Sequence, residues 1–390
     1  MATYILTDLA SDLWVEHFAI DQQGLGLPPG VRCSITKQRL RGGRRDGVDL
    51  IRVDNGNLAF TVVPTRGMGI WKAQCGGDRL GWDSPVQDGP VHPAFVNLAA
   101  QGGLGWLDGF DELLARCGLA WNGAPFTEGA ALYGLHGRIA NLPASYVAIH
   151  VSQDPPHEIV VEGRVEESHL FGPGIQLITR ITTYPGQRGL VVRDEFVNLK
   201  DQPIDFQILY HWNFGPPFLE PGARFLAPVK TVTPRDRRAA EGIDRYGEFD
   251  GPSPGTTEQV YFFELLPGLV DPARTLAMLC NRAGDRAVVL EFRLDQLPCF
   301  TLWKNTGGSR DGYVTGLEPG TNYPNPRSFE KARGRVPSLE VNGRRVVETR
   351  LTVVTGEAAV RAVEGEIGRT QSQALAVVHQ YPTEPFTAAG

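Results

Sequence analysis

Cysteine and long apolar runs are both scarce in this chain of 390 residues. The five cysteines show no CxxC spacing, which predicts reduced thiols and a cytoplasmic protein. No stretch approaches the ~20 consecutive apolar residues that a membrane-spanning helix needs. The first residues, MATYILTDLASDLW, also lack the basic and apolar regions of a secretory signal. We therefore expect no membrane association.

Basic residues are outnumbered by acidic residues, 38 to 44. The formal net charge is −6, and the one basic run is RLRGGRR at 39–45. A surface that binds nucleic acid needs a stripe or cluster of lysine and arginine. The composition therefore predicts no nucleic-acid partner.

Glycine and proline, by contrast, are abundant, with 46 and 29 copies. Together with many short apolar runs between turn signals, they predict a chain rich in strands and loops. No linker or break in composition divides the chain, so we expect a single domain over residues 1–390. Strands are predicted at 51–63, 158–165, 175–184, 190–197, 287–292 and 345–354.

One helix is predicted, over residues 104–119, where apolar residues recur with helical spacing. It would pack across a sheet edge or roof a binding cleft, and a roof would bring Cys117 and Trp121 near a ligand. Residues 234–255, rich in charge, proline and glycine, are predicted to form a mobile surface loop.

A single glutamate, Glu318, stands between an apolar strand and a loop dense in turn residues. The strand is predicted over residues 312–317, and Pro319 begins the run that ends regular structure. A carboxyl at a strand end can point into a cleft built of loops, where acid/base chemistry is common. Alternatively, Glu318 is a surface carboxylate that caps a turn or pairs with Arg327 or Arg333.

Two histidines occupy comparable positions. The segment LYGLHGRIANLPA, 132–144, sets His136 and Arg138 beside a glycine that permits close approach of a ligand. Either histidine could instead hydrogen-bond a neighbouring carbonyl.

The second histidine, His211, ends an apolar strand in FQILYHWNFGPPFL, 206–219. Beside it, Trp212 could stack on a sugar ring and Asn213 could bond hydroxyls. The aromatic rings could equally pack in the core.

Taken together, these segments resemble the aldose 1-epimerase (galactose mutarotase-like) superfamily, and more closely a bacterial branch without an assigned substrate. The resemblance spans most of the chain and implies a mainly β fold, a large antiparallel β-sandwich with few short helices and a sugar cleft on one face. It rests on four ordered motifs: FTVVPTRGMGI with LGWDSPV (60–86), GLHGRIANLPA (134–144), YHWNFGPPFL (210–219) and GYVTGLEPGTNYPNPRSFEKARGRV (312–336).

Carried over to this sequence, the resemblance makes His211 the catalytic histidine and Glu318 the catalytic base. His136 and Arg138 match the substrate-binding element. Better-known members bring an additional aspartate that grips sugar hydroxyls, and this chain departs from them there. The candidates for that role are Asp194 and Asp311.

Interconversion of sugar anomers needs one base at the anomeric hydroxyl and one acid at the ring oxygen. We predict Glu318 as base and His211 as acid, which requires a protonated His211 near neutral pH and no cofactor. In a metal-dependent alternative, His136, His211 and Glu318 bind a divalent metal ion for isomerisation, epimerisation or elimination on a sugar. A non-catalytic sugar-binding module is a further alternative, because fold does not fix function.

Three arginines within the motifs, Arg66, Arg138 and Arg327, favour an anionic sugar as the small-molecule partner, since arginine pairs with anions in two-pronged fashion. They could instead tie loops to carbonyls and to acids such as Glu330. Edge strands that pair between subunits would make the protein a homodimer.

Overall fold

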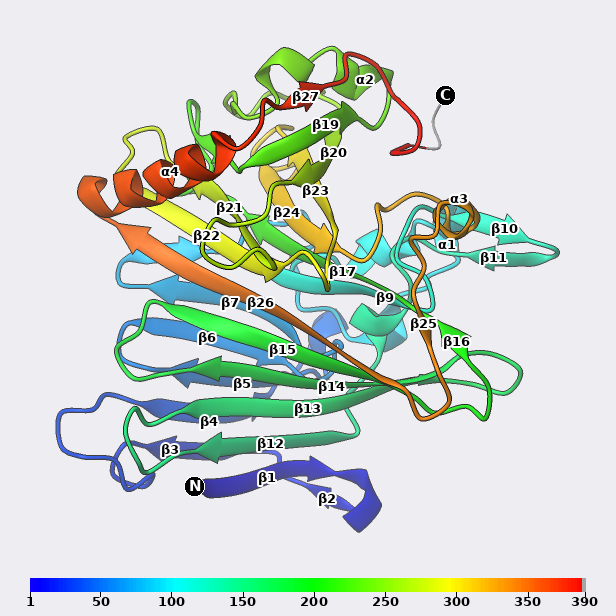
Figure 1. Cartoon of the computed structure of the whole chain (residues 1–390). Helices are drawn as coiled ribbons and strands as arrows, with labels where there is room; N and C mark the ends of the chain where they lie inside the picture. Colours follow the sequence, from blue (N-terminus) through cyan, green and yellow to red (C-terminus); the bar gives the residue numbers. More distant parts are fainter. Residues whose placement is uncertain (388–390) are drawn as a thin grey trace.

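Two large β-sheets pack face to face in the computed structural model, which describes residues 1–387 (Figure 1). Within those residues, one sheet has ten strands in the order β18 (Arg224–Leu226), β21 (Arg274–Cys280), β22 (Arg286–Arg293), β26 (Arg344–Thr355), β15 (Gly189–Asn198), β14 (Gly174–Thr183), β13 (Ile159–Ser168), β12 (Tyr146–Val151), β1 (Ala2–Asp8) and β2 (Leu13–Trp14).

The other sheet has thirteen strands within the same residues. Its order is β27 (Val377–Val378), β19 (Val229–Pro234), β20 (Gln259–Leu265), β23 (Cys299–Asn305), β24 (Val314–Gly320), β17 (Gln207–Phe214), β9 (Leu114–Leu119), β7 (Gly69–Cys75), β6 (Leu58–Val63), β5 (Asp49–Asp54), β4 (Ser34–Arg39) and β3 (Phe18–Asp21), with β8 (Asp78–Leu80) beside β7. Two short pairs complete the strands: β10 (Phe126–Glu128) with β11 (Ala131–Tyr133), and β16 (Ile204–Asp205) with β25 (Ser338–Leu339).

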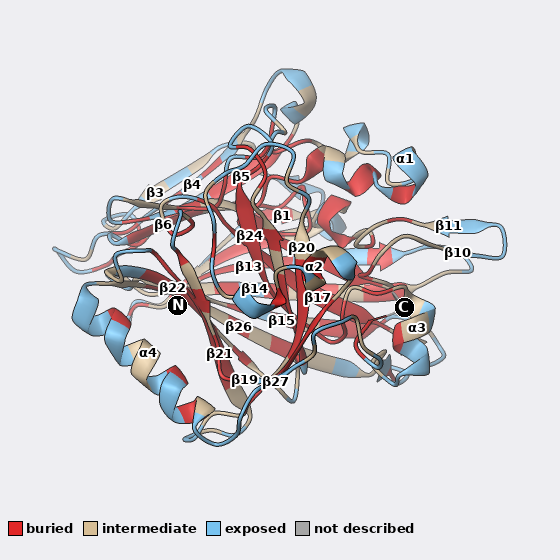
Figure 2. Cartoon of the chain, turned by 90° about the horizontal axis from the view of Figure 1, so that it is seen from above, coloured by how far each residue is buried: buried red, intermediate tan, exposed pale blue. Residues whose placement is uncertain are grey.

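The helices are short and peripheral. They are α1 (Ala100–Gly103), α2 (Arg237–Ala240), α3 (Arg327–Ala332) and α4 (Glu357–Gln371). The longest, α4, packs Val360 and Ile367 against the ten-stranded sheet and leaves its other side exposed (Figure 2). Across residues 1–387, no helix has the length and apolar character that crossing a membrane requires.

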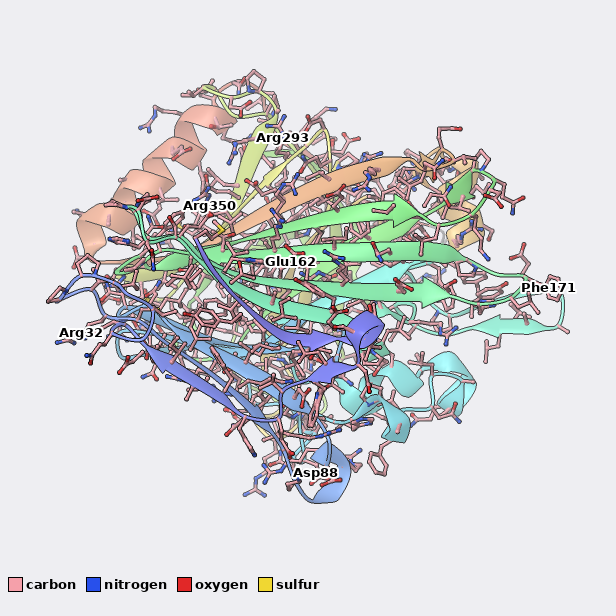
Figure 3. The ribbon with its side chains drawn as sticks, turned by 90° about the horizontal axis from the view of Figure 1, so that it is seen from below. Arg32, Asp88, Glu162, Phe171, Arg293 and Arg350 are labelled. Carbon is pink, nitrogen blue, oxygen red and sulfur yellow. The ribbon has the colours of Figure 1, made fainter. Side chains whose placement is uncertain are left out.

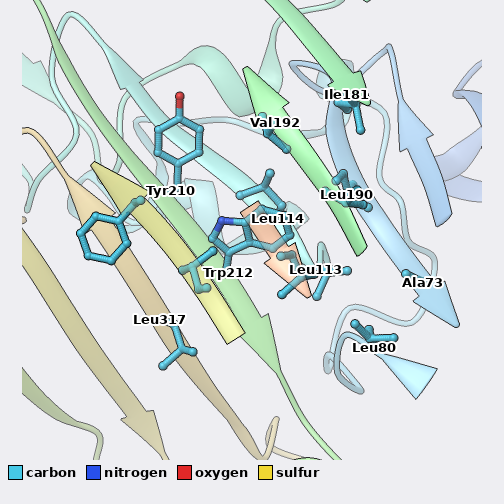
Figure 4. Close-up of a cluster of buried hydrophobic side chains, with 14 of the residues drawn as sticks. Ala73, Leu80, Leu113, Leu114, Ile181, Leu190, Val192, Tyr210, Trp212 and Leu317 are labelled. Atoms are coloured by element: carbon cyan, nitrogen blue, oxygen red, sulfur yellow. The ribbon is translucent and has the colours of Figure 1, made fainter. Parts of the chain in front are cut away.

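The main core lies between the two sheets and takes alternate side chains from each strand. Tyr210 and Trp212 of β17 share it with Leu190 and Val192 of β15 (Figure 4). On the other face of the ten-stranded sheet the same alternation places charged residues, such as Glu162 of β13, which is buried beneath its ion pairs with Arg164 and Arg180 (Figure 3). The sandwich predicted from the sequence is therefore confirmed.

The predicted strands correspond to β13, β14, β15, β22 and β26, and the stretch 51–63 divides into β5 and β6. The predicted helix over 104–119 is wrong. A 3₁₀ turn, Gly105–Gly109, is followed by β9, every residue of which is buried. A strand buried on both faces lacks alternation, so its apolar residues can match helical spacing by chance. Residues 234–255, predicted as a surface loop, contain α2 and bury Ile243 and Phe249.

Candidate active site

Strand β17 places His211 on the side of the thirteen-stranded sheet that faces away from the main core. Ile208, Tyr210 and Trp212 enter that core, so Leu209 and His211 point the other way. Trp212 was predicted to stack on a ligand, and this prediction is wrong because its ring is fully buried between the sheets (Figure 4). The alternation of side chains along the strand predicts this burial, because Trp212 lies two residues from Tyr210 and shares its face.

Glu318 lies within strand β24, which runs on to Gly320, and not beyond a strand end as predicted. Leu209 pairs with Gly320 and Trp212 pairs with Leu317 across β17 and β24. This register sets His211 directly opposite Glu318, and opposite residues on antiparallel strands have neighbouring side chains. The sheet itself therefore brings the two predicted acid/base groups together.

Asn213 fixes the tautomer of His211. Its side-chain nitrogen donates to the backbone oxygens of Glu112 (3.0 Å) and His211 (2.9 Å), so its Oδ1 accepts from His211 Nδ1 at 2.6 Å. A proton on Nδ1 leaves Nε2 as the titrating atom. Asn213 was predicted to bond ligand hydroxyls, but it is fully buried behind His211 and orients the ring instead.

His211 Nε2 lies 3.1 Å from Glu318 Oε1. Oε1 nevertheless has no hydrogen-bond partner among residues 1–387, so the contact is close but not aligned as a hydrogen bond. Glu318 is 2% exposed and His211 is 4% exposed. A buried carboxylate oxygen without a partner is costly unless a ligand supplies one.

Burial governs the protonation of this pair. Desolvation, together with the nearby His136, lowers the pKa of His211 well below its ordinary value. Desolvation, together with Glu258, raises the pKa of Glu318 well above its ordinary value. Burial therefore favours the uncharged form of each group, the protonated carboxyl of Glu318 and the neutral imidazole of His211. This differs from the protonated His211 that the sequence led us to expect, although the pair still holds one mobile proton.

His136 reaches the same cleft through a left-handed turn, with φ of 60° at His136 and 72° at Gly137. A Cβ on Gly137 would lie 2.2 Å from the backbone oxygen of Trp121, so only glycine fits. The Nδ1 of His136 donates to the backbone oxygen of Asn122 at 2.9 Å, and burial lowers the pKa of His136 to about 4. Its Nε2 is therefore an unprotonated acceptor at neutral pH.

A cavity of about 710 Å³ joins His136, His211 and Glu318. Its walls carry the rings of Trp106, Phe110 and Trp303, and each of these rings lies within 6.3 Å of the His211 ring, centroid to centroid. Aromatic rings beside a few convergent polar groups are typical of small-molecule sites. Residues 104–110 thus do roof the cleft, but Cys117 and Trp121 do not line it.

Sequence reasoning missed the rim of the cleft. Arg235 and Glu258 stand at the ends of β19 and β20, and their side chains are bonded at 2.9 Å. The Nε1 of Trp303 donates to the same glutamate at 2.6 Å. Trp303 lies two residues from Thr301, the partner of Glu318 across β23 and β24, and only this strand pairing places it at the cleft. No local signal marked Arg235.

None of the three predicted arginines lines the cavity. Arg66 is buried and donates to the side chains of Glu112 and Asn141 and to two backbone oxygens. Arg327 pairs with Asp205 at 2.8 Å, and Arg138 lies outside the lining. For Arg66 and Arg327 the loop-tying alternative is therefore correct.

The candidates for the additional aspartate also lie elsewhere. Asp194 is buried in the main core, where it pairs with Arg116 at 2.5 Å and accepts from Tyr210. Asp311 is exposed and does not line the cavity. Over residues 1–387, no three or more His, Cys, Asp and Glu side chains meet in an arrangement suited to a metal ion.

The fold is shared with proteins of the galactose mutarotase-like class. A galactose mutarotase-like protein from Clostridium acetobutylicum superposes with a TM-score of 0.55 at 15% identity, over 83% of this chain and 99% of its own. A galactose 1-epimerase from Lactobacillus acidophilus gives 0.53 at 11% identity, over 84% and 100%. At these identities the likeness concerns the fold alone.

A nearer relative comes from Klebsiella pneumoniae subsp. pneumoniae and is provisionally named an aldose 1-epimerase. It has a TM-score of 0.94 and 36% identity over 98% of both chains. Residues 45–353 match the model of a family described as a domain of unknown function, DUF4432. No curated protein matches the chain. The chain belongs to the DUF4432 family, within the aldose 1-epimerase (galactose mutarotase-like) superfamily.

Proposed function

We propose that the protein interconverts the anomers of a sugar by acid/base ring opening at Glu318 and His211. The observation that carries the proposal is the unpartnered Glu318 Oε1, 3.1 Å from His211 Nε2 at a cavity of about 710 Å³. Aromatic walls fit the C–H faces of a sugar ring, and the acceptor on His136 fits a hydroxyl.

Ring opening needs one proton removed and one proton supplied, which a pair with a single mobile proton provides. Glu318 takes the proton of the anomeric hydroxyl, the bond from C1 to the ring oxygen breaks, and His211 protonates that oxygen. The open-chain carbonyl then faces a protonated Glu318 and a neutral His211. After rotation about C1–C2, both transfers run backward on the other face of C1.

The resting state favoured by burial, with the proton on Glu318, is the state that ring opening produces. A cyclic sugar must therefore draw the proton onto His211 when it binds. A sugar hydroxyl that donates to Oε1 supplies the partner that the carboxylate lacks, which favours the ionised form of Glu318. Substrate binding and ionisation of Glu318 are coupled in this way.

The sugar we propose is uncharged. Arg235 is the one arginine or lysine among the cavity residues of the described chain, and both of its acidic neighbours, Asp236 and Glu258, line the cavity with it. An anionic sugar would meet these two carboxyls and Glu318 against a single guanidinium that is already paired. A uronate should therefore bind more weakly than the corresponding neutral hexose.

Proton NMR of anomeric exchange in D₂O tests the function with a panel of neutral aldoses, ketoses and uronates. We expect faster exchange of one neutral sugar, no deuterium on carbon, and a loss of about 10²–10⁴-fold in Glu318→Gln and His211→Asn. Glu340→Gln, an exposed change, should keep the wild-type rate. Deuterium at C2, or activity lost with EDTA and restored by a divalent ion, would instead support the metal-dependent alternative. Binding of a sugar that is unaccelerated in every variant would indicate a binding module.

A further inference from the structure

The segment that follows Glu318 has a role that acid/base chemistry does not explain. Glu330 of α3 is fully buried. It accepts from Asn325 Nδ2 at 2.7 Å and twice from Arg335, at 2.6 and 2.8 Å. A buried carboxylate with three such bonds holds both partners in fixed positions.

These two partners bind the end of the described chain. Asn325 Nδ2 donates to the backbone oxygen of Phe386 at 2.8 Å, and Arg335 Nη2 donates to that of Pro385 at 2.9 Å. Because both bonds end on backbone oxygens, they fix the course of the backbone at residues 385 and 386 and do not depend on the side chains there. The motif NPRSFEKARGR, 325–335, is therefore a clamp on residues 385 and 386.

Residues 379–387, which end in the clamped residues 385 and 386, continue the chain beyond β27, the edge strand of the thirteen-stranded sheet (Figure 1). Phe386 is 7% exposed and packs in a cluster with Val260 and Tyr323. Thr387 Oγ1 donates to the backbone oxygen of Arg235 at 2.8 Å. Val260, Arg235 and Thr387 all line the cavity. The segment thus joins two stretches of the cleft wall that are far apart in sequence.

We propose that residues 383–387, held by the clamp of Glu330, Asn325 and Arg335, form a wall of the sugar cleft that limits the size of the sugar. This inference rests on the proposed function for its substrate, but not for the wall itself. The packing of Phe386 fixes the position of this wall, and Thr387 is the residue of the wall that lines the cleft.

Two variants open the wall without touching the acid/base pair: Phe386→Ala, and a chain that ends at Gln380. Tyr381→Ala is the matched control, since Tyr381 is in the same segment but 75% exposed. We expect a rise of at least tenfold in KM for the monosaccharide, kcat within about threefold, and new acceptance of a disaccharide with the same reducing sugar. Thermal melts confirm folding, and the point variant serves if the shortened chain does not fold.

A second readout needs no sugar. Diethyl pyrocarbonate modifies neutral histidine, and peptide mapping gives its rate at His136. An open wall should speed this modification severalfold in both variants and leave Tyr381→Ala unchanged. If KM and the modification rate both match wild type in folded variants, residues 383–387 are not a wall. If the wild type turns over no sugar but His136 is modified faster in the two variants than in the wild type, the wall is confirmed and the proposed function is wrong.

Discussion

At the scale of single residues, the acid/base pair depends on a glycine that neither binds nor reacts. A Cβ on Gly316 would lie 2.4 Å from Glu318 Oε1 and 3.0 Å from His211 Cε1. Because Gly316 has no side chain, Glu318 and His211 have room to approach each other beside it. Its backbone is ordinary for a strand, so steric room and not conformation makes the position glycine.

Gly316→Ala should therefore lower kcat about 10²-fold, because displacement of a reacting group by about 1 Å has effects of this size. The melting temperature should change little, since the clash is with the movable end of a side chain. Anomeric exchange and a thermal melt measure both. Gly368→Ala is the control: no atom lies within 4 Å of its Cβ, and it should stabilise helix α4 by about 1 kcal/mol without affecting exchange. Wild-type kcat in Gly316→Ala would contradict the placement of Glu318 and His211.

The individual residues of the site also show how much of it could be predicted from the sequence. His136, His211 and Glu318 were predicted and do line one cavity. Asn213 and Trp212 were assigned to the ligand, yet a strand with period two sends neighbours to opposite faces, and a polar residue behind a histidine looks like one in front of it. The alternation along β17 therefore contained the direction of Trp212, whereas the groups that surround Asn213 depend on the register of the sheet, which motif spacing does not contain.

At the scale of elements, one buried ion pair ties the two sheets together. Arg116 of β9 bonds both oxygens of Asp194 of β15, at 2.5 and 3.0 Å, and both side chains are fully buried. Removing one member of such a pair leaves an uncompensated charge in the core, which usually costs about 3–5 kcal/mol.

Asp194→Asn should accordingly lower the free energy of unfolding by about 3 kcal/mol or more, measured by urea denaturation. Because Asp194 does not line the cavity, KM for the sugar should stay within about twofold. Asp295→Asn breaks an exposed pair with Arg293 and should cost less than about 1 kcal/mol. A large rise in KM with unchanged stability would restore Asp194 as the residue that grips sugar hydroxyls.

Strands β13 to β15 could be predicted because one face is apolar and the other charged. Strand β9 could not, since it is buried on both faces and its apolar residues fit two periods at once. The cleft draws on 104–136, 211, 235–260, 301–326 and 387, and no local pattern brings such distant segments together. Only the strand order of the sheet does so.

At the scale of the whole molecule, the buried pair makes stability depend on pH. The pKa of Glu318 is raised in the folded state by desolvation, while its ordinary value is 4.5. Below pH 4.5 the glutamate is protonated in both the folded and the unfolded state, so it does not lower the free energy of unfolding. As pH rises above 4.5, the unfolded chain ionises first, so stability falls until pH reaches the raised folded pKa, by about 1.4 kcal/mol per unit of difference.

Glu318→Gln cannot ionise and keeps the shape of the protonated acid, so it should be more stable than wild type at pH 8 and close to it at pH 4.5. Urea unfolding of both proteins across this range measures the gap, which should widen steadily with pH until the folded pKa is passed. Glu340→Gln, exposed in the folded chain, should show no such widening. The gap would be absent if Glu318 were ionised and paired with a protonated His211, the state we assign to the sugar complex. A saturating sugar should therefore narrow the gap at pH 8, which links the energetic cost of ionising the buried Glu318 to the proton that the reaction moves.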